Sequence, residues 1–159
     1  MENNECVLLN RIAESYYKLL TCIDWKDQLM VSGLNEGLNK FISNAFLSSF
    51  PQGTNKYLKA HYISKEARKK INAGDFENLI FEHIIPKQKY IQEPCIAKAK
   101  AGDLNIEYVQ NLLNKYWHIA TITKEEDKGL PKFQMPKNWD GEDIFFRYRD
   151  TGIELEKIS

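Results

Sequence analysis

Hydrophobic residues recur with helical spacing along the first fifty positions of the chain. One apolar stripe with steps of mostly three or four residues runs from Val7 to Ile23, and a second runs from Leu34 to Phe46. This spacing places the apolar side chains on one face of an α-helix. A cluster of turn-forming residues at 49–53 follows the second stripe. We therefore predict two amphipathic helices in residues 1–53, which form an N-terminal helical lobe.

The pattern changes in the second third of the chain. Ser64 is suited to cap a lysine-rich helical segment that stops at Gly74. Residues 79–85 then form a short run of β-branched, aliphatic and aromatic residues, which Pro86 ends. A run of this composition, closed by proline, is typical of a strand at the edge of a sheet.

A helix, a strand and a second helix are predicted after this strand. Residues 106–116 carry apolar side chains at helical spacing, with Asp103 or Asn105 as the N-cap. Residues 117–122 have the composition of a strand, and residues 123–126 read Thr-Lys-Glu-Glu, the pattern of a capping box. A short helix at 143–149, stopped by Gly152, follows. The fold class is therefore α+β, mainly helical, with a second lobe at 54–159 that carries a helical insertion.

Composition and charge narrow the setting of the protein. Its 159 residues have zero net charge, but basic residues exceed acidic ones between positions 56 and 100, and acidic residues exceed basic ones after it. The basic block suits a polyphosphate partner, or it is the solvated face of a helix. Three widely spaced cysteines, an acidic N-terminus and the absence of an apolar run of about 20 residues predict a cytoplasmic protein without a membrane span.

Glu82 and His83 stand side by side at the end of the first predicted strand, and Asp127 lies in the first turn of the capped helix. With these residues the chain resembles the HNH, or ββα-metal, nuclease superfamily over residues 79–130. The resemblance implies a strand–strand–helix core in which His83 activates water and Glu82 and Asp127 bind one divalent cation. The central asparagine of the family has no clear counterpart, although Asn111 and Asn114 are candidates. A homodimer is implied by analogy, since cutting both strands of a duplex takes two copies.

The chemistry of these residue types fits phosphodiester hydrolysis. Carboxylate ligands favour Mg²⁺ or Mn²⁺, and histidine accepts a proton near neutral pH. Residues expected to bind the phosphates of the substrate are Lys87, Lys89 and Arg147. We therefore expect a metal-dependent endonuclease that acts on nucleic acid, with DNA preferred to RNA, in microbial or phage defence or conflict. A non-catalytic binding domain, antitoxin or immunity protein is the alternative.

Overall fold

The computed structural model describes the backbone of residues 2–158, and contacts divide the chain into two compact units. The first unit contains the chain up to Gln52 together with Lys87–Tyr116, and the second contains Gly53–Pro86 and the chain from Trp117 onward. The first segment of the first unit ends at Gln52, one residue before the end of the N-terminal lobe predicted at residues 1–53. Residues 87–116, which we expected as an insertion in the second lobe, group instead with the N-terminal helices.

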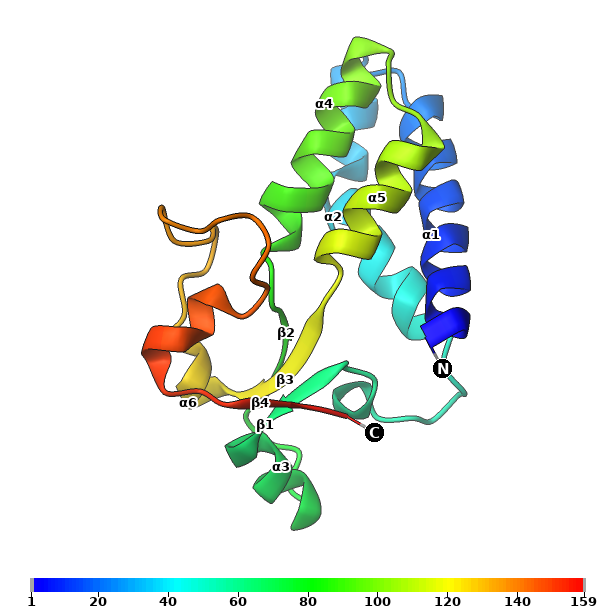
Figure 1. Ribbon diagram of the computed structural model, residues 1–159. Helices are drawn as coiled ribbons and strands as arrows, with labels where there is room; N and C mark the ends of the chain where they lie inside the picture. The colour runs from blue at the N-terminus through cyan, green and yellow to red at the C-terminus, as the bar shows by residue number, and fades with distance from the viewer. Residues whose placement is uncertain (1, 159) are drawn as a thin grey trace. The chain divides into compact units, whose positions relative to one another are not determined.

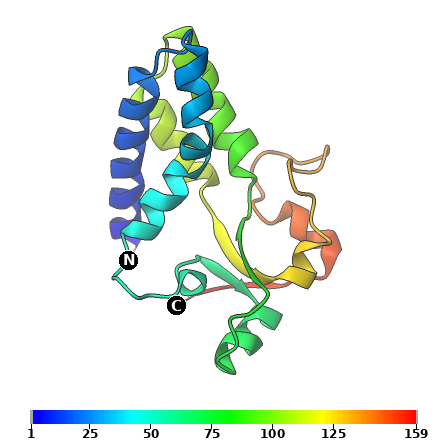
Figure 2. The same ribbon diagram turned by 180° about the vertical axis from the view of Figure 1, so that it is seen from behind.

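The first unit is built from helices (Figures 1 and 2). Its elements are α1 (Glu2–Cys22), α2 (Gln28–Ser48), the π-helix η2 (Gln88–Gln92), α4 (Glu93–Ala101) and α5 (Ile106–Tyr116). The two predicted N-terminal helices and the helix at 106–116 are thereby confirmed. The sequence analysis did not predict η2 and α4. Their first turns contain glutamine, lysine and proline, and they show no clear apolar stripe.

Helix α1 lies at the centre of the first unit, where it packs against α2, α4 and α5. Tyr16 is fully buried on α1, and its ring stacks on that of Phe41 with 5.7 Å between the centroids. The Asp27 side chain caps α2 by accepting hydrogen bonds from the first free amides of the helix. The amide of Gln92, also buried, donates to the carbonyl oxygen of Leu38. This unit therefore combines an apolar core with a capped helix and a hydrogen-bonded buried glutamine.

The second unit contains a four-stranded mixed sheet with short helices around it (Figure 1). The strands are β1 (Tyr62–Ser64), β2 (Leu79–His83), β3 (Ile119–Thr123) and β4 (Leu155–Lys157), in the order β2-β3-β1-β4. Strand β3 is antiparallel to β2 and parallel to β1, and β4 is antiparallel to β1. The helices are η1 (Lys56–Leu58), α3 (Lys65–Asn72), α6 (Lys124–Asp127) and η3 (Phe146–Thr151). The mainly helical α+β fold class is thus confirmed, and β2 is an edge strand, as expected.

Each face of this sheet carries its own apolar cluster, because side chains alternate along a strand. On one face, Ile84, Ala120 and Ile122 pack with Leu130 and Tyr148. The other face holds a cluster of buried residues from β1, α3 and β2, namely Ile63, Ala67 and Leu79. Strand β2 therefore presents even-numbered residues to the first cluster and odd-numbered residues to the second.

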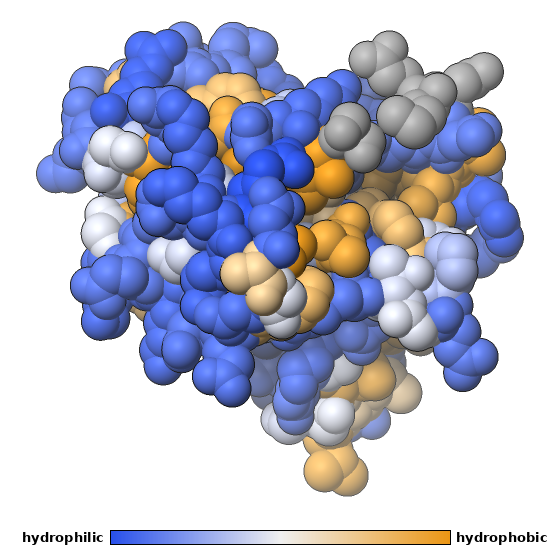
Figure 3. All heavy atoms as spheres, turned by 90° about the horizontal axis from the view of Figure 1, so that it is seen from below, coloured by the Kyte–Doolittle hydropathy of each residue, from blue (hydrophilic) through white to orange (hydrophobic). Residues whose placement is uncertain are grey.

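Polar side chains cover most of the face drawn in Figure 3, where hydrophobic ones gather in small groups. Within the part of the chain that is described, none of the helices combines the length and the apolar character that crossing a membrane requires.

Candidate functional site

Glu82 lies near the end of β2 on the face that carries Tyr148. The strand register pairs it with Ala120 of β3, a member of the same apolar cluster. Its side chain is 19% exposed. The carboxylate is therefore held at the border between the core of the second unit and solvent.

The short helix α6 follows β3 and begins with the predicted capping box. The Thr123 hydroxyl accepts a hydrogen bond from the Glu126 amide at 3.2 Å, and Glu126 Oε2 accepts one from the Thr123 amide at 2.8 Å. The Ser64 hydroxyl, which also caps α3, donates to the same carboxylate oxygen at 2.7 Å. Glu126 therefore fixes the start of α6 to β3 and β1, and Asp127 is the last residue of this helix of about one turn.

Asp127 lies close enough to Glu82 for their charges to interact. Burial raises the pKa of Glu82, the neighbouring Asp127 raises it further, and Arg147 and Lys132 oppose the rise. Asp127 itself forms an ion pair with Lys132. The Asp127 side chain is 18% exposed and that of Lys132 is 43% exposed, so solvent reaches this end of the cluster. The two carboxylates that the sequence predicts as metal ligands thus lie on contacting elements, β2 and α6, and their charges interact.

Arg147, predicted to bind phosphate, is instead buried beneath these carboxylates with 2% of its surface exposed. Its guanidinium group forms an ion pair with Glu82 and donates to the carbonyl oxygens of His83, Ile84 and Pro131. The distances to the last two are 2.7 and 2.6 Å. With these acceptors and no exposed surface, the guanidinium group holds η3 to the end of β2 and is not placed to contact a substrate.

His83 does not share a face with Glu82, because adjacent residues of a strand point to opposite sides. Its ring packs against Trp117 with 4.8 Å between the centroids. The other two histidines lie nearby in the sheet: His61 Nδ1 accepts a hydrogen bond from the Ile119 amide, and the rings of His61 and His118 are 6.2 Å apart. His61 lies between η1 and β1. The predicted pairing of an acid and a base from residues 82 and 83 is not assembled on one face.

The remaining predicted contacts to substrate belong to the first unit. Lys87 donates to the carbonyl oxygen of Asn39, and burial lowers its pKa. Lys89 is exposed on η2. Asn111 and Asn114 are exposed on α5. The cluster described above is therefore made by residues of the second unit alone.

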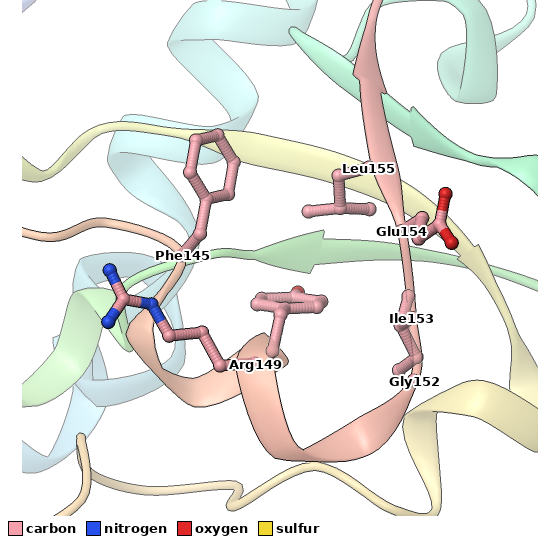
Figure 4. A pocket seen from close by; sticks show the side chains of 7 residues that line it. Phe145, Arg149, Gly152, Ile153, Glu154 and Leu155 are labelled. Carbon is pink, nitrogen blue, oxygen red and sulfur yellow. The ribbon is translucent and has the colours of Figure 1, made fainter.

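A hollow of about 550 Å³ lies between η3 and β4 in the second unit (Figure 4). Its walls include the rings of Phe145 and Tyr148 and the side chains of Ile153 and Leu155, and Arg149 and Glu154 lie at its edge. Sequence reasoning missed this hollow because it did not predict β4. Lys132 was also missed, because its ion pair with Asp127 joins α6 to the loop that follows and is not a contact within the helix.

Comparison with protein-family models gave no match, and comparisons with curated proteins and with solved structures gave none either.

Proposed function

We propose that this protein is a divalent-metal-dependent endonuclease of the HNH type, which hydrolyses phosphodiester bonds of nucleic acid, with DNA as the preferred substrate. The observation that carries the proposal is the contact between β2 and α6, which places Glu82 and Asp127 near enough for their charges to interact. Strands β2 and β3 are antiparallel and α6 follows β3 directly, which is the order of elements that the HNH resemblance implies.

The two carboxylates suit a cation of the magnesium type. Mg²⁺ is commonly held by one or two carboxylates and keeps several of its water ligands. The described residues contain no group of three or more histidine, cysteine, aspartate or glutamate side chains placed to hold a metal ion. The site would therefore be a water-rich one, with Glu82 and Asp127 as its protein ligands.

Each neighbouring side chain then has a role that follows from its position. Arg147 is buried and fixes the Glu82 carboxylate, so Glu82 is held in place before any ligand binds. Lys132 reaches Asp127 from the solvent side and is exposed enough to move onto a phosphate oxygen. The bound ion would neutralise charge on the phosphate and activate a water molecule.

The experiment compares cleavage of plasmid, single-stranded DNA and RNA in Mg²⁺, Mn²⁺ or EDTA. We expect metal-dependent cleavage that is lost in Asp127→Asn. The matched control is Glu125→Gln, which removes a charge from the same helix at a side chain that is 82% exposed. Cleavage by Asp127→Asn at the normal rate, or cleavage that persists in EDTA, would contradict the proposal.

His83→Ala tests the predicted general base separately. Loss of cleavage, with unchanged urea stability and unchanged Mn²⁺ binding, would assign His83 to the reaction even though its ring packs on Trp117. Full cleavage would remove His83 from the mechanism and leave the acidic pair in place.

A non-catalytic binding, antitoxin or immunity protein is the second candidate. It is favoured by the charge balance of the cluster, in which Arg147 pairs with Glu82 and Lys132 pairs with Asp127. A cluster that is neutral by itself needs no metal ion. This candidate predicts that Mn²⁺ titration detects no binding that depends on Asp127.

A further inference from the structure

Residues 128–139, which we call the basic loop, connect α6 to the C-terminal segment in a long excursion from the sheet (Figure 1). The loop contains three lysines, Lys128, Lys132 and Lys137, and no acidic residue. All three lysines are exposed. At its centre stands Phe133, which is 82% exposed although it is a large apolar residue. The Phe133 ring is therefore open to a ligand from solvent, in a loop that also carries three exposed lysines.

Both sides of the exposed segment are fixed to the second unit. Leu130 and Met135 are buried on either side of Phe133. The carbonyl oxygen of Pro131 accepts a hydrogen bond from buried Arg147. The indole of Trp139 donates to the Asp143 carbonyl oxygen at 2.8 Å. The ring of Phe133 is therefore presented to solvent by a segment that is held close on both sides.

We infer that the basic loop binds single-stranded nucleic acid, with an unstacked base on the Phe133 ring and backbone phosphates at the lysines. Proteins that bind single strands combine aromatic rings, on which bases stack, with cations that follow the backbone. A base inside a duplex is already stacked on both faces, so an exposed ring of this kind favours a single strand. The positive charges of the three lysines match the negative charge of this ligand.

The loop is continuous with the acidic pair of the proposed active site. Lys132, the residue before Phe133, forms an ion pair with Asp127. Lys128, the first residue of the basic loop, forms an ion pair with Glu125 of α6, and both side chains are largely exposed. Exposed ion pairs of this kind contribute little to stability, so a phosphate can replace the carboxylate as the partner of the lysine. The inference rests on the proposed function in this respect: it names single-stranded nucleic acid, or an unpaired segment of a duplex, as the substrate class.

The test measures the binding of fluorescein-labelled oligo(dT) and of a blunt-ended, fully paired duplex by anisotropy in EDTA, where metal-dependent cleavage does not occur. We expect Phe133→Ala to weaken oligo(dT) binding by about tenfold, the effect of one lost base stack. Duplex binding should change much less. Phe133→Trp should restore the affinity, and oligo(dT) should quench the fluorescence of the new indole. Leu29→Ala is the control, because Leu29 is 85% exposed in the first unit.

Lys137→Gln tests the phosphate contacts independently of the ring. It should reduce the slope of log Kd against log salt for oligo(dT) by about 0.7 if the lysine neutralises one phosphate. An unchanged slope would remove Lys137 from the interface.

The inference is overturned by wild-type protein that does not bind oligo(dT), by a Phe133→Ala variant that binds it normally, or by equal losses for oligo(dT) and duplex. Normal metal-dependent cleavage together with any of these results would leave the proposed nuclease standing without this binding site. Phe133-dependent binding without cleavage in Mg²⁺ or Mn²⁺ would support the binding site and contradict the proposed nuclease.

Discussion

Replacing Arg147 by methionine should destabilise the second unit severely. The guanidinium group is buried, and it forms an ion pair with Glu82 besides donating to three backbone carbonyl oxygens. Methionine keeps much of the length and volume of the side chain but provides no donor. The substitution therefore leaves the Glu82 carboxylate without its cation and the carbonyl oxygens without these hydrogen bonds.

The expected loss is at least about 4 kcal/mol in the free energy of unfolding. Removing one partner of a buried ion pair costs about 3–5 kcal/mol, because the other charge remains in a poorly solvated place. Glu82 keeps 19% of its side-chain surface, so some of this cost is recovered by hydration. The unsatisfied carbonyl oxygens add about 1–3 kcal/mol each where water does not reach them. Because a typical domain is stable by about 5–15 kcal/mol, this loss is a large fraction of the total.

Urea unfolding followed by tryptophan fluorescence measures the effect, since Trp117 and Trp139 both belong to the second unit. The control is Arg149→Met. The Arg149 side chain is 65% exposed and forms an ion pair with Asp143, so its loss should change the free energy of unfolding by less than about 1 kcal/mol. The double variant Glu82→Gln/Arg147→Met should lose less than the sum of its two single variants. An Arg147→Met variant that loses less than about 1 kcal/mol would refute the reasoning.

Three further predictions concern single positions. Burial raises the pKa of Glu82, so the native state holds the proton of this carboxyl group more tightly than the unfolded state does. The free energy of unfolding should therefore fall as pH rises from the ordinary carboxyl pKa to the raised one. Urea titrations of wild-type protein and Glu82→Gln at several pH values measure this contribution as the difference between the two proteins. Thr123→Ala should cost about 1 kcal/mol by removing the N-cap of α6, whereas Thr123→Ser should restore most of it in the same titration. Gly102→Ala should cost about 1–2 kcal/mol, because Gly102 ends α4 with a φ of 76°; a thermal midpoint equal to that of wild-type protein would contradict this.

Local signals in the sequence were sufficient for much of the second unit. The capping box at Thr123 and the N-cap at Ser64 are formed as predicted, because both depend on residues three positions apart. Strands β1 and β4 were missed. Each has three residues, and they pair with partners far away in the sequence, so neither has a periodicity that can be read locally.

The site was predicted in part for the same reason. Glu82 and Asp127 were named from the HNH resemblance, and they lie on contacting elements, β2 and α6, where their charges interact. The burial of Arg147 could not be predicted, because it depends on the way η3 returns to the end of β2. The alternation of β2, by contrast, was available from the sequence: once residues 79–85 are read as a strand, Glu82 and His83 belong to opposite faces.

The two ion pairs of the cluster differ in what they can do, and this difference makes Asp127 the more informative position. Arg147 has no exposed side-chain surface and serves the fold, so changes at Glu82 alter stability and any bound ligand together. Lys132 lies 43% exposed over Asp127, and its ion pair can open without disturbing the core. Asp127→Asn should therefore change the unfolding free energy by less than about 1 kcal/mol. If it does so and still abolishes cleavage or Mn²⁺ binding, the acidic pair has a function beyond folding. If it leaves both unchanged, the cluster serves to attach η3 and the basic loop to the sheet.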